Sequence, residues 1–132
     1  MKITPDTNLL VRALTHDDAA QAERAEAALA SAELVAFSLV VLCELGWVLR
    51  RSYKIPAADI AEGIRRLTSG DTVAVDRRSL EAGLDFLDRG GDFADGVIAH
   101  QGYELGGDVF VSFDRHAVDL VKRAGEAAHL LG

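Results

Sequence analysis

Residues 39–49 read Leu39-Val-Val-Leu-Cys-Glu-Leu-Gly-Trp-Val-Leu49, a stretch that is apolar on almost every side of a helix. This pattern predicts a helix buried in the core. Its only acid, Glu44, has apolar neighbours at helical spacing, among them Val40 and Trp47. A carboxylate buried there needs a cation, a metal ion or a proton, because an unpaired buried charge costs several kcal/mol. The alternative is a Glu that reaches solvent at the helix rim, or one that pairs with an arginine such as Arg12.

The composition is that of one globular domain, which we expect to span residues 1–132. The net charge of −7 argues against nucleic-acid binding by bulk electrostatics, although carboxylates that hold cations could still approach a phosphate. The single cysteine, Cys43, excludes an internal disulfide and is typical of a reducing compartment. No signal-peptide pattern opens the chain, and the longest apolar stretch is too short to span a bilayer. We therefore expect a cytoplasmic protein with no membrane association.

Short β-like and longer helical patterns alternate along the whole chain. The expected strands cover residues 2–5, 34–37, 72–75, 108–112 and 127–131. The expected helices cover residues 8–14, 19–30, 39–54, 56–67, 77–88, 92–103 and 115–123. This alternation predicts an α/β fold with a mostly parallel sheet covered on both faces.

Four acids are expected at or beside one edge of this sheet. Asp6 follows the first strand, Asp114 follows the fourth, and Glu44 lies in the helix after the second. Asp95 lies in the first turn of the helix before the fourth strand. Each aspartate also has a structural explanation, because Asp6 and Asp114 could cap helices and Asp92 could form a capping-box-like pair with Asp95. Taken together, clustered carboxylates repel one another, and this favours a site for Mg²⁺ or Mn²⁺.

Four segments in this order resemble the PIN-domain family: Asp6-Thr7-Asn8, Ser38 with Glu44, Asp92-Phe-Ala-Asp95-Gly-Val-Ile-Ala99, and Ser112-Phe-Asp114-Arg115. The length and order of elements resemble the VapC-type toxins of prokaryotic toxin–antitoxin pairs. The resemblance implies a PIN-like three-layer α/β/α sandwich with a mostly parallel central sheet of four to five strands. The small departures from the family pattern are Pro5, Gly96 and Ser112, and none of them removes an acid.

The resemblance also implies an activity and a set of site residues. The activity is that of a Mg²⁺- or Mn²⁺-dependent endoribonuclease, usually a homodimer, which cleaves RNA and is held inactive by a cognate antitoxin protein. Carried over by position, the catalytic and metal-binding acids are Asp6, Glu44, Asp95 and Asp114, with Asp92 as an auxiliary metal ligand. Thr7, Asn8 and Ser112 would orient the carboxylates. Arg12 and Arg115 could bind substrate phosphates, as could Arg50, Arg51 and Lys54 if they do not simply form a solvated helix end.

Other classes of protein fit the sequence less well. A haloacid-dehalogenase-type phosphatase needs a second Asp where this chain has Asn8. A phosphoacceptor receiver domain needs an Asp at the end of a central strand near mid-chain and a Lys after a late strand, and neither arrangement is found. A catalytically silent PIN-like module that serves as a binding scaffold remains the alternative. Trp47 and Tyr53 are predicted to lie in the core or an interface rather than to stack on bases.

Overall fold

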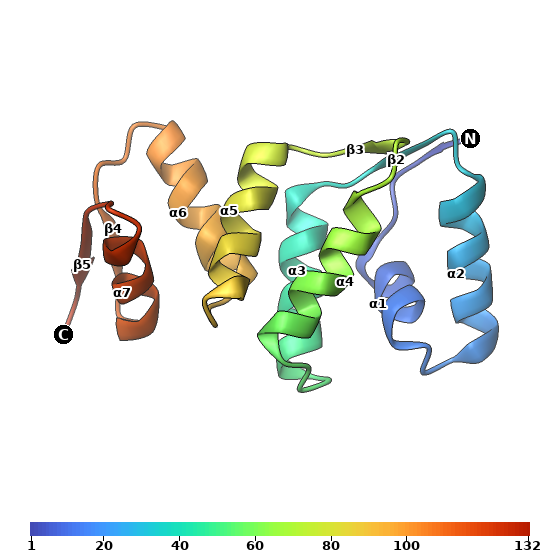
Figure 1. Ribbon diagram of the computed structural model, residues 1–132, viewed down its shortest axis with the longest axis horizontal. Helices are drawn as coiled ribbons and strands as arrows, with labels where there is room; N and C mark the ends of the chain where they lie inside the picture. Colours follow the sequence, from blue (N-terminus) through green and yellow to red (C-terminus); the bar gives the residue numbers. More distant parts are fainter.

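The computed structural model of the protein describes residues 1–132 and shows short strands alternating with longer helices (Figure 1). The elements are β1 (Lys2–Ile3), α1 (Thr7–Thr15), α2 (Ala19–Ser31), β2 (Leu34–Ala36), α3 (Leu39–Arg51), α4 (Ala57–Thr68), β3 (Val73–Ala74), α5 (Arg77–Asp88), α6 (Phe93–Glu104), β4 (Phe110–Ser112), α7 (Arg115–Arg123) and β5 (Ala128–Leu130). The predicted α/β class is confirmed, and each expected element is present with ends shifted by a few residues. None of the helices is long and apolar enough to cross a membrane.

All strand pairs are parallel, and the strands form two small sheets. The first has the order β1-β2-β3, with Val35 of β2 opposite Ile3 on one side and Val73 on the other. The second pairs β4 with β5. The expected four or five strands are thus divided between two sheets, because β1 and β4 do not pair. Pro5 lies two residues after the end of β1 and has no N–H group to donate to a neighbouring strand. The number of backbone hydrogen bonds that β1 can form is therefore small.

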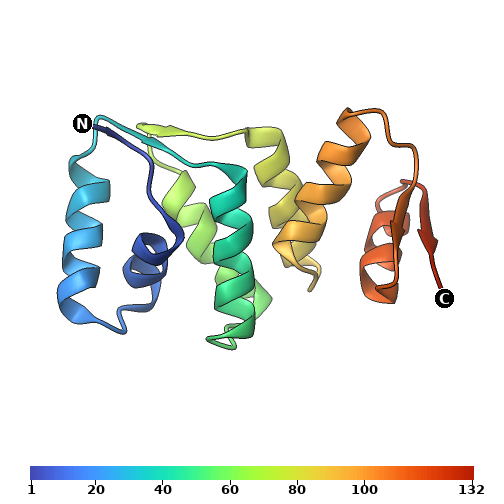
Figure 2. The same ribbon diagram turned by 180° about the vertical axis from the view of Figure 1, so that it is seen from behind.

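The larger apolar core lies among α1, α3, α4, α5 and α6, beside β2. Seventeen buried residues form one cluster, and Leu10, Leu42, Leu45 and Ile64 within it have no exposed surface. The apolar residues Ile60, Ala61 and Ile64 of α4 lie in this core. Figures 1 and 2 show the first sheet running along one edge of this part of the molecule, with α1 to α4 extending from it.

The second sheet and α7 lie at the far end of the molecule from the N-terminus (Figures 1 and 2). Three buried residues, Phe86, Leu120 and Val121, form the cluster that joins them to α5. Val111 of β4 is 52% exposed, and Phe113 just after β4 is 80% exposed. The fourth strand was expected to be covered on both faces, but in the structure its outer face is open.

The helix α3 is buried on one side only. Leu42, Leu45 and Leu49 point into the core, whereas Val40 and Trp47 are 71% and 55% exposed. Glu44 shares this exposed side. The prediction that α3 is buried all round is therefore wrong, and so is the inference that Glu44 needs a partner because it is buried. Apolar composition alone does not identify the side of a helix that remains open.

Candidate active site

The first candidate acid, Asp6, lies at the N-terminus of α1. One of its carboxylate oxygens accepts a hydrogen bond from the backbone N–H of Leu9 at 3.0 Å. This is the capping role that the sequence allowed. The other oxygen accepts no hydrogen bond from the protein, and the side chain is exposed. Capping therefore leaves one oxygen of Asp6 free for a ligand.

Glu44 is tied to α1 through Thr7. The Thr7 hydroxyl donates a hydrogen bond of 2.9 Å to Oε1 of Glu44, which links α1 to α3. This is the orienting role expected of Thr7. Glu44 has no arginine or lysine partner, since Arg12 instead pairs with Asp17 at 2.9 Å and reaches Tyr53. The structure therefore brings Asp6, Thr7 and Glu44 together, and leaves Arg12 outside the group.

A second group of acids lines a cavity of about 100 Å³. Asp92, Asp95 and Asp114 share this cavity with Arg50 and His116. Asp92 occupies the N-cap position of α6 but makes no capping hydrogen bond, and the Asp95 carboxylate accepts no hydrogen bond from the protein. The expected capping-box-like pair is therefore absent. These two half-buried carboxylates have no structural bond that would explain their position.

The electrostatic environment of this cavity disfavours the charged form of Asp95. Burial raises the pKa of Asp95 above its ordinary value, and the negative charges of Asp92 and Asp114 raise it further. Both effects disfavour the charged carboxylate, and a bound cation would oppose both of them. The cavity thus has the chemical character of a cation site.

Asp114 is held by its backbone surroundings. Its Oδ1 accepts hydrogen bonds from the N–H groups of His116 at 3.0 Å and Ala117 at 3.3 Å, which caps α7. Ser112 accepts a hydrogen bond of 2.9 Å from the Asp114 N–H through its hydroxyl oxygen. Ser112 therefore fixes the backbone of Asp114 and does not contact the carboxylate. Arg115, next in the chain, is exposed and forms no ion pair.

The predicted acids do not all share one cavity. Neither Asp6 nor Glu44 lines the cavity of Asp95, and neither contributes to its raised pKa. No three His, Cys, Asp or Glu side chains are placed as a ready-made metal site. Asn8 lies apart from both groups, in a groove between α1 and α2 that Arg12 also lines.

Two basic residues, Arg50 and His116, line the Asp95 cavity. Nη2 of Arg50 donates a 3.4 Å hydrogen bond to the Gly90 carbonyl, and Nε2 of His116 lies 3.3 Å from the same oxygen. Nη1 of Arg50 is buried and has no hydrogen-bond partner. In sequence, Arg50 was one of several basic residues at a helix end, and only the fold shows which one reaches the acids. The thiol of Cys43 is no alternative nucleophile, since burial raises its pKa.

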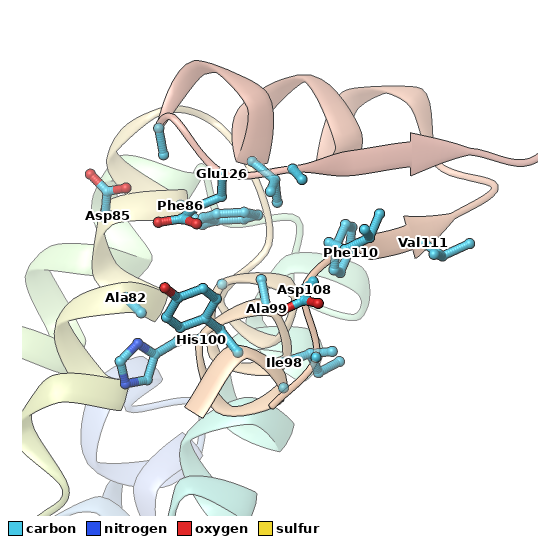
Figure 3. Close-up of a pocket in the computed structure, with 18 of the residues that line it drawn as sticks. Ala82, Asp85, Phe86, Ile98, Ala99, His100, Asp108, Phe110, Val111 and Glu126 are labelled. Atoms are coloured by element: carbon cyan, nitrogen blue, oxygen red, sulfur yellow. The ribbon is translucent and has the colours of Figure 1, made fainter. Parts of the chain in front are cut away.

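A larger cavity of about 440 Å³ lies between α6 and the second sheet and contains none of the predicted acids. Figure 3 shows the rings of Phe86 and Phe110 on its walls, with Asp85 and Glu126 near Phe86. Its lining is mostly apolar. It is a separate feature from the cavity that holds Asp95.

Comparison with known proteins agrees with the resemblance in the sequence. The chain matches the family described as PIN domain over residues 3–123. That range includes all four segments that carry the resemblance, from Asp6 to Arg115. No curated protein matches the chain.

Proposed function

Because the chain belongs to the PIN-domain family, whose members are generally nucleases, we propose that it is a metal-dependent endoribonuclease. The finer part of this proposal is that it hydrolyses RNA in the cytoplasm as the VapC-type toxin of a toxin–antitoxin pair. The observation that carries the proposal is the environment of Asp95. A half-buried carboxylate between two others has no protein partner, and this is the arrangement that a divalent cation stabilises.

The donor set fits Mg²⁺ or Mn²⁺ by its chemistry, since both ions prefer carboxylate oxygens. Asp95, Asp114 and the auxiliary Asp92 would hold the ion, and the free oxygen of Asp6 together with Glu44 would complete the site. Asp114 is carried by the C-terminal segment, which is attached to the rest by few buried residues. We therefore expect its carboxylate to adjust its position to the ion more readily than those of the other acids.

When bound, the ion would lower the pKa of a water molecule and offset the charge that develops on the phosphate. The residues of the chain position the acids around it. Thr7 fixes one oxygen of Glu44 through its hydroxyl, and the N-terminus of α7 together with Ser112 fixes Asp114. The fold thus restricts the acids to a few orientations.

The partners are also part of this proposal. A homodimer and a cognate antitoxin would accompany the toxin role. The cavity of about 440 Å³ fits an amphipathic, basic antitoxin segment, because it combines an apolar lining with the acids Asp108 and Glu126, whereas its third acid, Asp85, is paired with Arg89. Failure of this chain to form a complex with the small protein encoded beside it would count heavily against the toxin role.

Cleavage of a mixed RNA pool tests the enzymatic proposal. Cleavage should require Mn²⁺ or Mg²⁺, stop in EDTA, and fall by at least about 100-fold in Asp95→Asn and in Asp6→Asn. Asp18→Asn is the matched control, because Asp18 only caps α2 and asparagine caps equally well. Full activity in Asp95→Asn would contradict the assignment of the site.

The competing function is a silent binding module built on the same fold. It predicts that the folded protein binds RNA or protein without cleaving RNA under any condition. It also predicts no heat of Mn²⁺ binding in calorimetry. Metal binding that disappears in Asp95→Asn would favour the nuclease even if the RNA pool lacked the true substrate.

A further inference from the structure

Trp47 is the only tryptophan of the chain, and it lies on the exposed side of α3. Tryptophan side chains are highly buried on average, so an exposure of 55% is unusual. The guanidinium of Arg51 lies over the indole ring, 5.4 Å from its centroid. This contact holds the ring in one orientation on the surface. An exposed, oriented aromatic ring is the kind of surface on which a nucleic-acid base stacks.

Trp47 lies close to the cavity of Asp95. Trp47, Arg50 and Asp92 line one small gap beside Phe93, and Arg50 and Asp92 also line the cavity itself. Arg50 therefore adjoins both Trp47 and the acids. Its Nη1 is buried without a partner, and a buried unpaired donor is costly unless a ligand satisfies it.

We propose that Trp47, Arg50 and Arg51 form a track that leads single-stranded RNA into the cavity of Asp95. Arg50 binds the phosphate at the mouth of the cavity, and the base of the adjacent nucleotide stacks on Trp47. This inference rests on the proposed nuclease function and adds to it the substrate form and the side of entry.

Charge favours RNA over a protein partner at this place. The protein carries a net charge of −7, yet neither Arg50 nor Arg51 is paired with a carboxylate. Two unpaired guanidinium groups beside an aromatic ring match a phosphate and its base. The preference for a single strand follows from stacking, because bases within a duplex do not expose a face to an indole ring.

The intrinsic fluorescence of the protein reports this contact directly, because Trp47 is its only source of tryptophan emission. Octauridylate should quench this emission, both for the wild type in EDTA and for Asp95→Asn in Mn²⁺. A blunt RNA duplex of the same length should quench it much less. Arg50→Gln should weaken the binding of octauridylate about tenfold or more. Absence of quenching in both conditions overturns the track.

Kinetics separate the track from the catalytic site. Trp47→Ala should raise the KM for single-stranded RNA by about 5- to 150-fold, the range expected for one stacked base, and leave kcat nearly unchanged. Trp47→Phe should recover part of the loss. Arg66→Gln is the matched control, since Arg66 is exposed and lies away from the Asp95 cavity.

The outcomes also distinguish the track from the proposed function. An unchanged KM in folded Trp47→Ala, with metal-dependent cleavage intact, overturns the track and leaves the nuclease proposal standing. Quenching by the antitoxin but not by RNA overturns it in favour of a protein contact. Absence of metal-dependent cleavage in the wild type, together with absence of RNA binding, rejects both proposals.

Discussion

The part of the molecule from α1 to α6 and the C-terminal unit formed by β4, α7 and β5 differ greatly in how they are held. Seventeen buried residues form the core of the former, and three form the cluster at the base of the latter. Asp6 and Glu44 belong to the well-packed part, whereas Asp114 begins α7. The acid site thus spans a rigid and a lightly held region. Ligand-binding segments are commonly drawn from the less stable parts of a protein.

Asp95 lies where these two regions meet. On α6, Phe93 and Val97 pack into the large core, while Ala99 contacts the small cluster. The acids of the cavity therefore come from both regions, and Asp114 belongs to the one with fewer buried residues. We expect a bound metal ion to stabilise the C-terminal unit more than the core.

The largest expected effect on stability comes from Leu45→Ala, because Leu45 has no exposed surface. Loss of its side chain should lower the free energy of unfolding by about 2–5 kcal/mol. Denaturation followed by Trp47 fluorescence measures this, since Trp47 lies on the same helix. Leu120→Ala, in the small cluster, should shift the same transition far less and instead speed amide exchange in α7. Equal shifts for both variants would show that the two regions unfold as one unit.

The next effect concerns the joint between α5 and α6. A Cβ on Gly96 would clash with the backbone oxygen of Ala82, so the two helices must separate to admit it. Gly96→Ala should therefore destabilise the protein by about 1–3 kcal/mol, despite the better helix propensity of alanine. It should also lower nuclease activity, because Asp95 is the neighbouring residue. Gly102→Ala is the control on the same helix, where an added Cβ meets nothing. A stable and active Gly96→Ala would contradict this tight joint.

A smaller effect is expected from Asp95→Asn without metal. Because the pKa of Asp95 is raised in the folded state, its ionisation opposes folding, and the stability of the wild type is lost as pH rises through that pKa. Asp95→Asn should remove this loss and raise Tm at neutral pH by a few degrees, on the order of 2–5 °C. Thermal scans at about pH 4 and pH 7 measure it.

Metal ions should reverse the order of stability of the wild type and Asp95→Asn. Saturating Mn²⁺ should stabilise the wild type, by about 2.7 kcal/mol at one hundred times Kd, and leave Asp95→Asn nearly unchanged. A wild type that is more stable than Asp95→Asn in EDTA at neutral pH would refute the idea that the acids of the cavity repel one another.

The order of the elements was predictable because a capping residue acts on the backbone only two or three residues away. Asp6 and Asp114 each accept a hydrogen bond from the backbone two or three residues later, which is the capping role that the sequence allowed. Ser38 and Asp76 cap α3 and α5 in the same way. The open side of α3 and the division into two sheets were not predictable. Both depend on which distant element packs against a given face, and periodicity does not encode that choice.

The candidate site was predictable in its residue types but not in its grouping. The motifs located Asp92, Asp95 and Asp114, which share a cavity, but gave no sign that Asp6 and Glu44 lie outside it. Arg12 was expected to contact substrate because it lies close to Asp6 in sequence. In the structure it is held by Asp17, whose pKa is lowered mainly by the hydrogen bond from Tyr53. Helix geometry placed Arg12 near the far end of α1, away from the acids.

The smallest expected effect is the most direct test of the difference between the two regions. Val35 in β2 is 3% exposed and Val111 in β4 is 52% exposed, although both are the middle residues of short parallel strands. Valine to threonine places a hydroxyl in the position of a methyl group, so Val35→Thr should cost about 1–3 kcal/mol. Val111→Thr should change the free energy of unfolding by less than about 0.5 kcal/mol. Chemical denaturation of both variants, in EDTA and at two protein concentrations, measures this pair. If Val111→Thr costs as much as Val35→Thr, the outer face of β4 is covered in solution. A cost that grows with protein concentration would identify a second copy of the chain as the cover, and one independent of concentration would identify a contact within the chain.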